Sequence, residues 1–363
     1  LREYFGFDSL RPLQQKVVSA FLSGRDCFVR AATGSGKSLC YQLPPLLLNK
    51  CAVVISPLIS LMEDQVKSLE QVRHANITAC ALTSTNTDGK TWSGALRGDY
   101  TMIYMAPERF ESWKHGIRKL VGEGRVCLFA IDEAHCISEW GHDFRSAYRC
   151  LHQLRDSFPS IPIMALTATA TERVEGDVIR SLKLQNPVVA KSGMDRPNLH
   201  YSVHPKNCMQ VIPKPPQTCH GSVIIYCLSR QKTEDIANWL SSKGIKAKVV
   251  AYHGSLASHQ RCALTEIHRM FSFDELQVVA ATIAFGMGID KPDIRMVVHY
   301  GMPKTMEAYV QQTGRAGRDG QPARCVMFWS NADLGMSNFY VKNITTTSGR
   351  FIHLFGAVFL LLC

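Results

Sequence analysis

The chain has 363 residues, of which 46% are hydrophobic and 20% are charged, a composition typical of a globular protein rather than a disordered or fibrous one. The length suits two domains, and the formal net charge of +11 favours a polyanionic partner such as nucleic acid. No apolar run reaches the ~20 residues needed to cross a bilayer, so we expect no membrane partner. The 13 cysteines form no C-x-x-C pair, which favours reduced thiols in cytosol or nucleus.

The region upstream of residue 27 carries candidates for an adenine clamp. Gln14 can bond the base through N6 and N7, an aromatic ring such as Phe7 can stack on it, and Arg11 lies between them in sequence. Phe7 taken alone is more typical of a core residue, which is the alternative to the clamp.

A phosphate-binding loop is predicted at residues 31–38, which read Ala-Ala-Thr-Gly-Ser-Gly-Lys-Ser. An apolar run at 27–29 precedes the loop, and a helix is expected from residue 39. Gly34 and Gly36 allow the backbone, including Thr33 and Ser35, to wrap a phosphate. Lys37 can reach the outer phosphates of a nucleotide, and the Ser38 hydroxyl can ligate magnesium. Ala31 replaces the first glycine of the strict pattern, so a plain turn with a surface lysine is the alternative.

Apolar runs then predict strands at 52–55, 101–105, 126–131 and 163–170. A helix is expected after the serine cap Ser56, and another from Thr171. Residues 73–99 are polar, with several Thr, Asn and Gly, and are expected to be mostly loop.

Two carboxylates follow the buried strand expected at 126–131. Ligands of open α/β sheets bind at the carboxyl ends of the strands, which is where Asp132 and Glu133 would lie. Asp132 would hold magnesium, and Glu133 would orient and deprotonate an attacking water. Downstream of a phosphate loop, this pair indicates nucleotide hydrolysis.

Residues 136–145 mix aromatic, acidic and basic side chains, unlike a core strand. Trp140 and Phe144 could stack on bases while Arg145 contacts phosphate. The alternative is that these aromatic rings pack the segment against its own domain.

The periodicity breaks near 190–200, where we place a linker, and an α/β pattern restarts with strands at 222–227, 248–251, 276–281 and 295–300 and a helix at 232–240. This half has no second phosphate loop, which suggests that it completes the first site. Arg315 and Arg318 lie three apart among glycines and suit phosphate charge, as in phosphoryl transfer. A solvated basic turn is the alternative.

Together these residues resemble a RecQ-type DNA helicase, a superfamily 2 motor with a DEAH box, over roughly residues 4–335. The matching segments, in order, are the clamp at Phe7, Arg11 and Gln14, the phosphate loop, residues 56–65, Asp-Glu-Ala-His at 132–135, residues 165–170, residues 284–291 and residues 314–320. Residues 55–66 and 134–145 look most like the Werner branch. The implied α/β fold has two tandem RecA-like domains, each a mostly parallel sheet flanked by helices, at 1–192 and 193–340, with the ATP site in the cleft between them.

The resemblance also implies a function and further site residues. It implies ATP and Mg²⁺ as cofactors, single-stranded and forked DNA as partners, and 3′-to-5′ translocation with unwinding in DNA repair, recombination and replication, in the nucleus. Arg318 would be the arginine finger with Arg315 beside it, and Asp290 would lie near the sugar of the nucleotide. Residues of motifs that track the DNA backbone would be Ser56, Arg230 and Thr282.

The chain departs from the family pattern in two places. Gln312 stands where the family usually has glutamate. Residues 341–363 form an atypical apolar tail where the family continues into zinc-binding and winged-helix modules, so we expect a fragment that hydrolyses ATP better than it unwinds DNA. The alternatives are a truncated ATP- or DNA-binding product without unwinding activity and an RNA helicase of the same superfamily.

Overall fold

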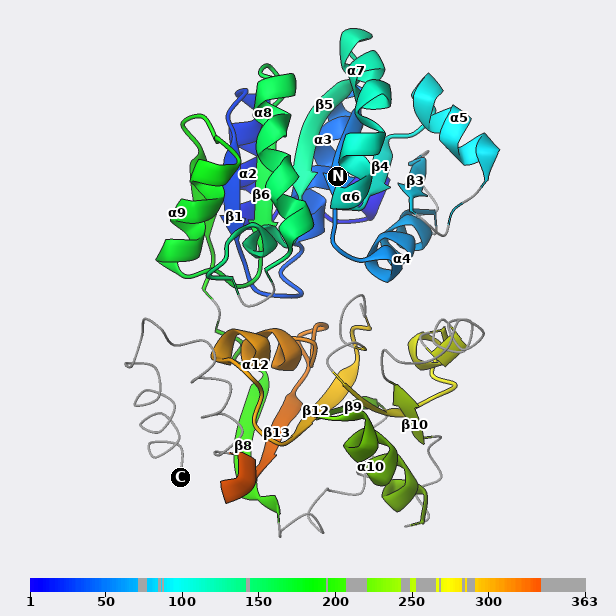
Figure 1. Cartoon of the computed structure of the whole chain (residues 1–363), viewed down its shortest axis with the longest axis vertical. Helices are drawn as coiled ribbons and strands as arrows, with labels where there is room; N and C mark the ends of the chain where they lie inside the picture. The colour runs from blue at the N-terminus through cyan, green and yellow to red at the C-terminus, as the bar shows by residue number, and fades with distance from the viewer. Residues whose placement is uncertain are drawn as a thin grey trace. The chain divides into compact units, whose positions relative to one another are not determined.

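The computed structural model describes residues 1–70, 77–83, 86, 88–141, 144–193, 195–206, 221–242, 249–252, 266–267, 269–282, 285 and 291–333. The chain divides into two compact units, the first comprising Leu1–Met194 and the second beginning at Asp195. Each unit contains one sheet with helices packed on it (Figure 1). Among the described helices, none combines the length and apolarity that a bilayer crossing requires.

The first unit is built on a seven-stranded sheet in the order β3-β4-β2-β5-β6-β1-β7, and every pair in it is parallel. Its strands are β1 (Cys27–Arg30), β2 (Cys51–Ile55), β3 (Ala79–Leu82), β4 (Met102–Met105), β5 (Val126–Ile131), β6 (Ile163–Thr167) and β7 (Val188–Lys191). Its helices are α1 (Arg2–Phe5), α2 (Pro12–Leu22), α3 (Lys37–Leu48), α4 (Ile59–Glu70), α5 (Gly89–Arg97), α6 (Pro107–Ser112), α7 (Lys114–Gly122), α8 (Gln153–Ser157) and α9 (Glu172–Ser181), with 3₁₀ turns η1 (Ala134–Ile137) and η2 (Ser146–His152).

The central strand β5 shows why this sheet forms. All six of its residues are buried, and alternate side chains enter opposite layers of core. Phe129 and Ile131 pack with residues of α5 to α9, whereas Leu128 and Ala130 pack with residues of α2 to α4. A parallel sheet covered on both faces requires such a continuous apolar run.

The expectation of loop over residues 73–99 is wrong where the structure describes them. Residues 79–82 form the edge strand β3, which is fully buried, and α5 follows at Gly89–Arg97. The helix has a clear start and stop, because the Asp88 side chain accepts hydrogen bonds from the backbone N–H groups of Lys90 and Thr91 and Gly98 takes the left-handed conformation after it. These caps are readable in the sequence, but polar composition obscured them.

The second unit has a six-stranded sheet in the order β10-β11-β9-β12-β13-β8, again parallel at every pair. Its strands are β8 (Leu199–Pro205), β9 (Ser222–Cys227), β10 (Val249–Tyr252), β11 (Val278–Ala281), β12 (Ile294–Tyr300) and β13 (Ala323–Trp329). Its described helices include α10 (Arg230–Ser242) and α12 (Met306–Thr313). The two units therefore confirm the predicted fold class of two parallel-sheet α/β domains.

Candidate active site

The phosphate loop joins β1 to the first turn of α3. Gly34 and Gly36 have φ angles of 76° and 79°, in the left-handed region that glycine adopts without strain. Lys37 is the first residue of α3, and its Nζ donates hydrogen bonds to the carbonyl oxygens of Ala31 at 2.8 Å and Ala32 at 3.1 Å. The loop thus folds around the lysine ammonium at a helix N-terminus, an arrangement that suits an anion.

Two of the predicted clamp residues hold this loop from the side. Gln14, which is 4% exposed, donates from Nε2 to the Gly36 carbonyl at 3.0 Å and accepts from the backbone N–H of Arg11 at 2.9 Å. Arg11 donates from Nη1 to the Gly34 carbonyl at 3.5 Å. A Cβ at Gly36 would lie 2.6 Å from Gln14 Nε2, and the φ of 79° also favours glycine at this position. Phe7 is 54% exposed, as a stacking ring would be, and adenine binding by the three stays a prediction.

The two predicted carboxylates follow β5 directly. Glu133 has a φ of 48°, and its backbone N–H donates to Asp132 Oδ1 at 3.0 Å. Desolvation of Asp132, followed by the neighbouring charge of Glu133, raises the pKa of the Asp132 carboxyl to about 7, while the Lys37 ammonium lowers it. A buried carboxyl beside a second carboxylate would be stabilised in its charged form by a bound cation. The Ser38 hydroxyl lies one residue beyond Lys37, at the start of α3. Ser38 and Asp132 therefore suit a magnesium ion.

His135 connects these carboxylates to the end of β6, a role that the sequence analysis missed. Its Nδ1 lies 2.9 Å from Thr167 Oγ1 and 3.3 Å from Glu133 Oε2, and the ring is 1% exposed. Thr167 Oγ1 in turn donates to the Thr169 carbonyl at 3.0 Å. The sequence did contain a signal for this contact. Thr167 and Thr169 carry hydroxyls at the end of the strand expected at 163–170, and His135 belongs to the motif at 132–135.

The aromatic-rich segment continues directly from the carboxylates through η1. Trp140 is 51% exposed and Phe144 is 37% exposed, so both rings are accessible. Arg145 points back into its own unit, because its Nη1 donates to the Pro57 carbonyl at 2.9 Å. Ser56 precedes Pro57 at the end of β2 and is only 2% exposed, so a direct contact with DNA would require this turn to open.

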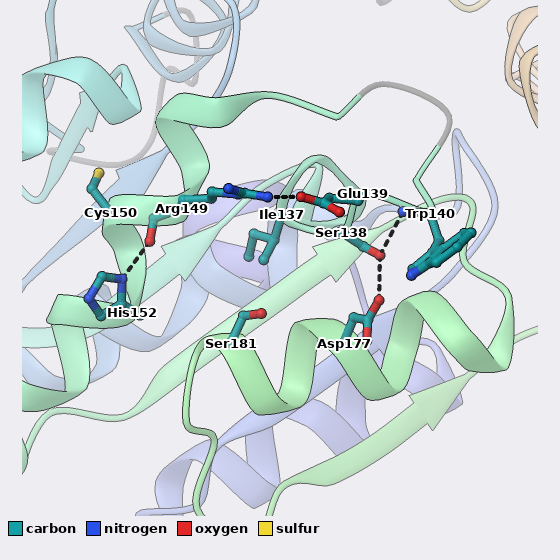
Figure 2. Close-up of a pocket in the computed structure, with 9 residues that line it drawn as sticks. All are labelled: Ile137, Ser138, Glu139, Trp140, Arg149, Cys150, His152, Asp177 and Ser181. Carbon is teal, nitrogen blue, oxygen red and sulfur yellow. Dashed lines mark hydrogen bonds and ion pairs between the residues drawn. The ribbon is translucent and has the colours of Figure 1, made fainter. Parts of the chain in front are cut away.

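A cavity of about 540 Å³ lies under this segment, against η2 and α9 (Figure 2). Ser138 Oγ donates to Asp177 Oδ2 on α9 at 2.8 Å and accepts from the Trp140 backbone N–H at 3.2 Å. Arg149 pairs with Glu139 across the cavity, as Figure 2 shows. The segment is therefore docked on α9 by a hydrogen bond at its centre.

The predicted arginines of the second unit follow α12. Arg315 is 6% exposed, and Arg318 is half-buried. Arg196 stabilises the turn that carries them, since its guanidinium donates to the carbonyls of Gly314, Ala316 and Gly317 at 2.7–3.3 Å. Burial, together with the nearby charge of Arg318, lowers the pKa of Arg196. Both arginines thus lie on a turn that hydrogen bonds from Arg196 hold in place.

Two of the remaining predicted contacts, Arg230 and Thr282, lie at the carboxyl edge of the second sheet. Arg230 is exposed at the first turn of α10, shortly after β9, and Thr282 is half-buried immediately after β11. Because β9 and β11 are neighbouring parallel strands, the structure places these two residues at one edge. Asp290 lies outside the described residues.

Comparison with known proteins defines the class of this fold and site. Residues 11–176 match the family model described as DEAD/DEAH box helicase, and residues 205–320 match the model described as helicase conserved C-terminal domain. The structure of Mycobacterium smegmatis helicase Lhr bound to ssDNA and AMP-PNP aligns with a TM-score of 0.72 at 20% identity, covering 93% of this chain and 48% of that one. The chain therefore has the tandem RecA-like fold of superfamily 2 helicase motors.

Sequence relatives narrow the class to a family. Over 93% of this chain, the sequence is 43% identical to the mouse bifunctional 3′-5′ exonuclease/ATP-dependent helicase WRN. Over 92% of this chain, it is 45% identical to the ATP-dependent DNA helicase RecQ of Pasteurella multocida. It belongs to the RecQ family of helicases. The alignments span 24% and 52% of those two relatives, and their similar identities do not assign the chain to the Werner branch.

Proposed function

We propose that this chain is an ATP-dependent DNA helicase motor whose ATP hydrolysis is stimulated by single-stranded DNA. The observation that carries the proposal is the position of the aromatic-rich segment. The segment, residues 136–145, follows Asp132 and Glu133 through η1 and leads to Tyr148, whose hydroxyl donates to the Asp132 carbonyl at 3.0 Å. DNA contacts on this segment would therefore act on the hydrolytic carboxylates.

The first unit would bind and hydrolyse the nucleotide. Backbone N–H groups of residues 33–36 and the Lys37 ammonium would hold the phosphates of ATP, and Phe7, Arg11 and Gln14 would hold the adenine. Ser38 and Asp132 would keep Mg²⁺, which when bound neutralises phosphate charge. Glu133 would accept the proton of the attacking water.

The second unit would supply positive charge to the transferring phosphoryl group. Arg318 is proposed as the arginine finger and Arg315 as its neighbour, and such an arginine contributes ~10³–10⁵ to the rate where measured. Asp290 would lie near the sugar. Closure of the two units on ATP would complete the catalytic site.

Single-stranded DNA would be held by stacking and by phosphate contacts. Trp140 and Phe144 offer accessible rings, while Ser56, Arg145, Arg230 and Thr282 are proposed for the DNA backbone. We further propose 3′-to-5′ translocation, activity on forked duplexes, and service in DNA repair, recombination and replication in the nucleus.

A phosphate-release assay with ATP and magnesium tests this function. Titration with a thymidine 30-mer should raise turnover, an RNA oligonucleotide should raise it less, and Trp140→Ala should retain basal turnover while losing the stimulation. A forked duplex with a 3′ tail tests unwinding and its polarity. Turnover indifferent to DNA, or stimulated more by RNA, would refute the proposal.

A further inference from the structure

Trp140, the tryptophan of the aromatic-rich segment, already has a side-chain partner on α9. Arg173, near the start of α9, places its Cζ 3.2 Å from the centroid of the Trp140 ring. Arg173 is itself exposed, and the ring remains 51% exposed. The guanidinium thus stacks on one face of the ring, as arginine does on aromatic rings in cation–π contacts.

This stack is part of a two-point attachment of the segment to α9. Residues four apart in a helix lie on one face, so Arg173 and Asp177 present their side chains together. Asp177 accepts the hydrogen bond from Ser138 Oγ at 2.8 Å, two residues before Trp140, and Figure 2 shows Ser138 and Trp140 lying over this helix. Asp177 also pairs with Arg180, so a second charge on α9 neutralises it. Arg173 therefore remains available to the ring.

We propose that Arg173 occupies the face of Trp140 on which a base of single-stranded DNA stacks, so that the DNA must displace it. This inference rests on the proposed function. A guanidinium and a base are both planar and cannot share one face of the indole. Base–aromatic stacking is stronger than an exposed cation–π contact, so a DNA base can displace the guanidinium. Because the guanidinium must first leave the ring, binding requires a higher DNA concentration than it would with an uncovered ring. Arg173 thereby sets the concentration of single-stranded DNA at which a base occupies Trp140.

The direct test measures binding of a fluorescein-labelled thymidine 20-mer by anisotropy. Arg173→Lys keeps the positive charge but loses the planar stack, and it should bind the strand about two- to five-fold more tightly than the unsubstituted chain. Arg173→Ala should bind more tightly than Arg118→Ala, which removes the charge of an exposed arginine on α7 and serves as the matched control. In a Trp140→Ala background, Arg173→Lys should have no effect.

A second measurement needs no DNA. Acrylamide quenching of Trp140, isolated by subtracting the same protein carrying Trp140→Phe, should increase in both Arg173 variants. Unchanged quenching would show that the ring is not covered in solution and would overturn the inference while leaving the proposed function intact.

The binding data separate the remaining outcomes. If Arg173 contacts a DNA phosphate instead, Arg173→Ala binds more weakly than the control and its salt slope falls by about one, which overturns the inference. Equal affinities overturn it as well. An unsubstituted chain that binds no single strand refutes the proposed function, and the inference falls with it.

Discussion

Tyr148 donates a hydrogen bond from its hydroxyl to the backbone carbonyl of Asp132 at 3.0 Å. The two residues are 16 apart in sequence, and the aromatic-rich segment lies between them. Tyr148 is 1% exposed, so the hydrogen bond is shielded from water. Movement of the segment that displaced Tyr148 would therefore be transmitted through this hydrogen bond to the backbone that positions Asp132 and Glu133.

The first prediction is that Tyr148→Phe weakens this transmission. The substitution keeps the packed ring and removes one hydrogen bond, at a cost of about 1 kcal/mol in unfolding free energy. Basal ATP turnover should remain within a few-fold, whereas the stimulation by single-stranded DNA should fall at least several-fold in a phosphate-release assay. Tyr201→Phe, at a 48% exposed position on β8, is the control. Equal loss of basal and stimulated turnover would contradict a transmitting role.

The second prediction separates nucleotide binding from hydrolysis. Lys37→Ala should abolish turnover, because the outer phosphates lose their main positive contact. Glu133→Gln should keep ATP binding and stop hydrolysis, because the amide cannot accept the proton of water. Equilibrium binding of a fluorescent ATP analogue beside phosphate release distinguishes the two. Near-normal turnover in Lys37→Ala would refute the site, and lost binding in Glu133→Gln would assign Glu133 a structural role.

The third prediction concerns a buried ion pair that stabilises the first unit. Asp26 and Arg155 are 3% and 6% exposed, with Arg155 Nη2 at 2.5 Å from Asp26 Oδ2. Asp26 also accepts from the backbone N–H groups of Ile163 at 2.8 Å and Gln185 at 2.6 Å. Asp26→Ala leaves a buried guanidinium unpaired, so it should lower the unfolding free energy by roughly 3–5 kcal/mol.

Urea unfolding measures this cost, and the chain supplies its own comparison. Asp156 and Lys183 form an ion pair whose side chains are 54% and 49% exposed, so Asp156→Ala should cost less than about 1 kcal/mol. The double variant Asp26→Ala/Arg155→Met should be more stable than Asp26→Ala alone, because no buried charge remains. Equal costs at the two pairs would show that burial does not govern this contact.

The sequence predicted the parallel sheets because their strands are continuous apolar runs. Val126–Ile131 is an example, with all six side chains buried. It missed β3, whose four residues are too short a signal among polar neighbours. It also did not predict β7, β8 or β13. For the site, motif spacing placed Lys37 and Asp132 near one edge of the sheet. Side-chain contacts such as Gln14 with Gly36 or Tyr148 with Asp132 depend on rotamers and long-range packing, which no local pattern encodes.

The last prediction concerns Gln312, a buried residue in the last turn of α12. Its Oε1 lies 2.7 Å from Nε2 of His299, which is 2% exposed, and the His299 ring packs between those of Tyr226 and Tyr309 at centroid distances of 5.5 and 5.0 Å. Burial lowers the pKa of His299 to about 4. The hydrogen bond that Gln312 Oε1 accepts raises this pKa and offsets only part of the effect of burial.

The sign of the pH dependence follows from this lowered pKa. The unfolded chain takes up a proton at His299 near pH 6.5 and the folded chain near pH 4, so the contribution of His299 is complete above pH 6.5 and is lost as the pH falls towards 4. The loss would reach about 3 kcal/mol at most. His299→Asn should flatten the decline in unfolding free energy over this window, and His200→Asn, at an exposed position on β8, should not.

Gln312→Glu provides the complementary test. A carboxylate at this distance favours the imidazolium, so the pKa of His299 should rise and the decline in stability over this window should shrink. Titration of the His299 ring by ¹H–¹⁵N NMR follows the pKa directly in both proteins, and urea unfolding from pH 4.5 to 7.5 follows the stability. A His299 that titrates near pH 6.5 in the unsubstituted chain, or a Gln312→Glu variant with an unchanged titration, would show that this contact does not set the protonation of the buried ring.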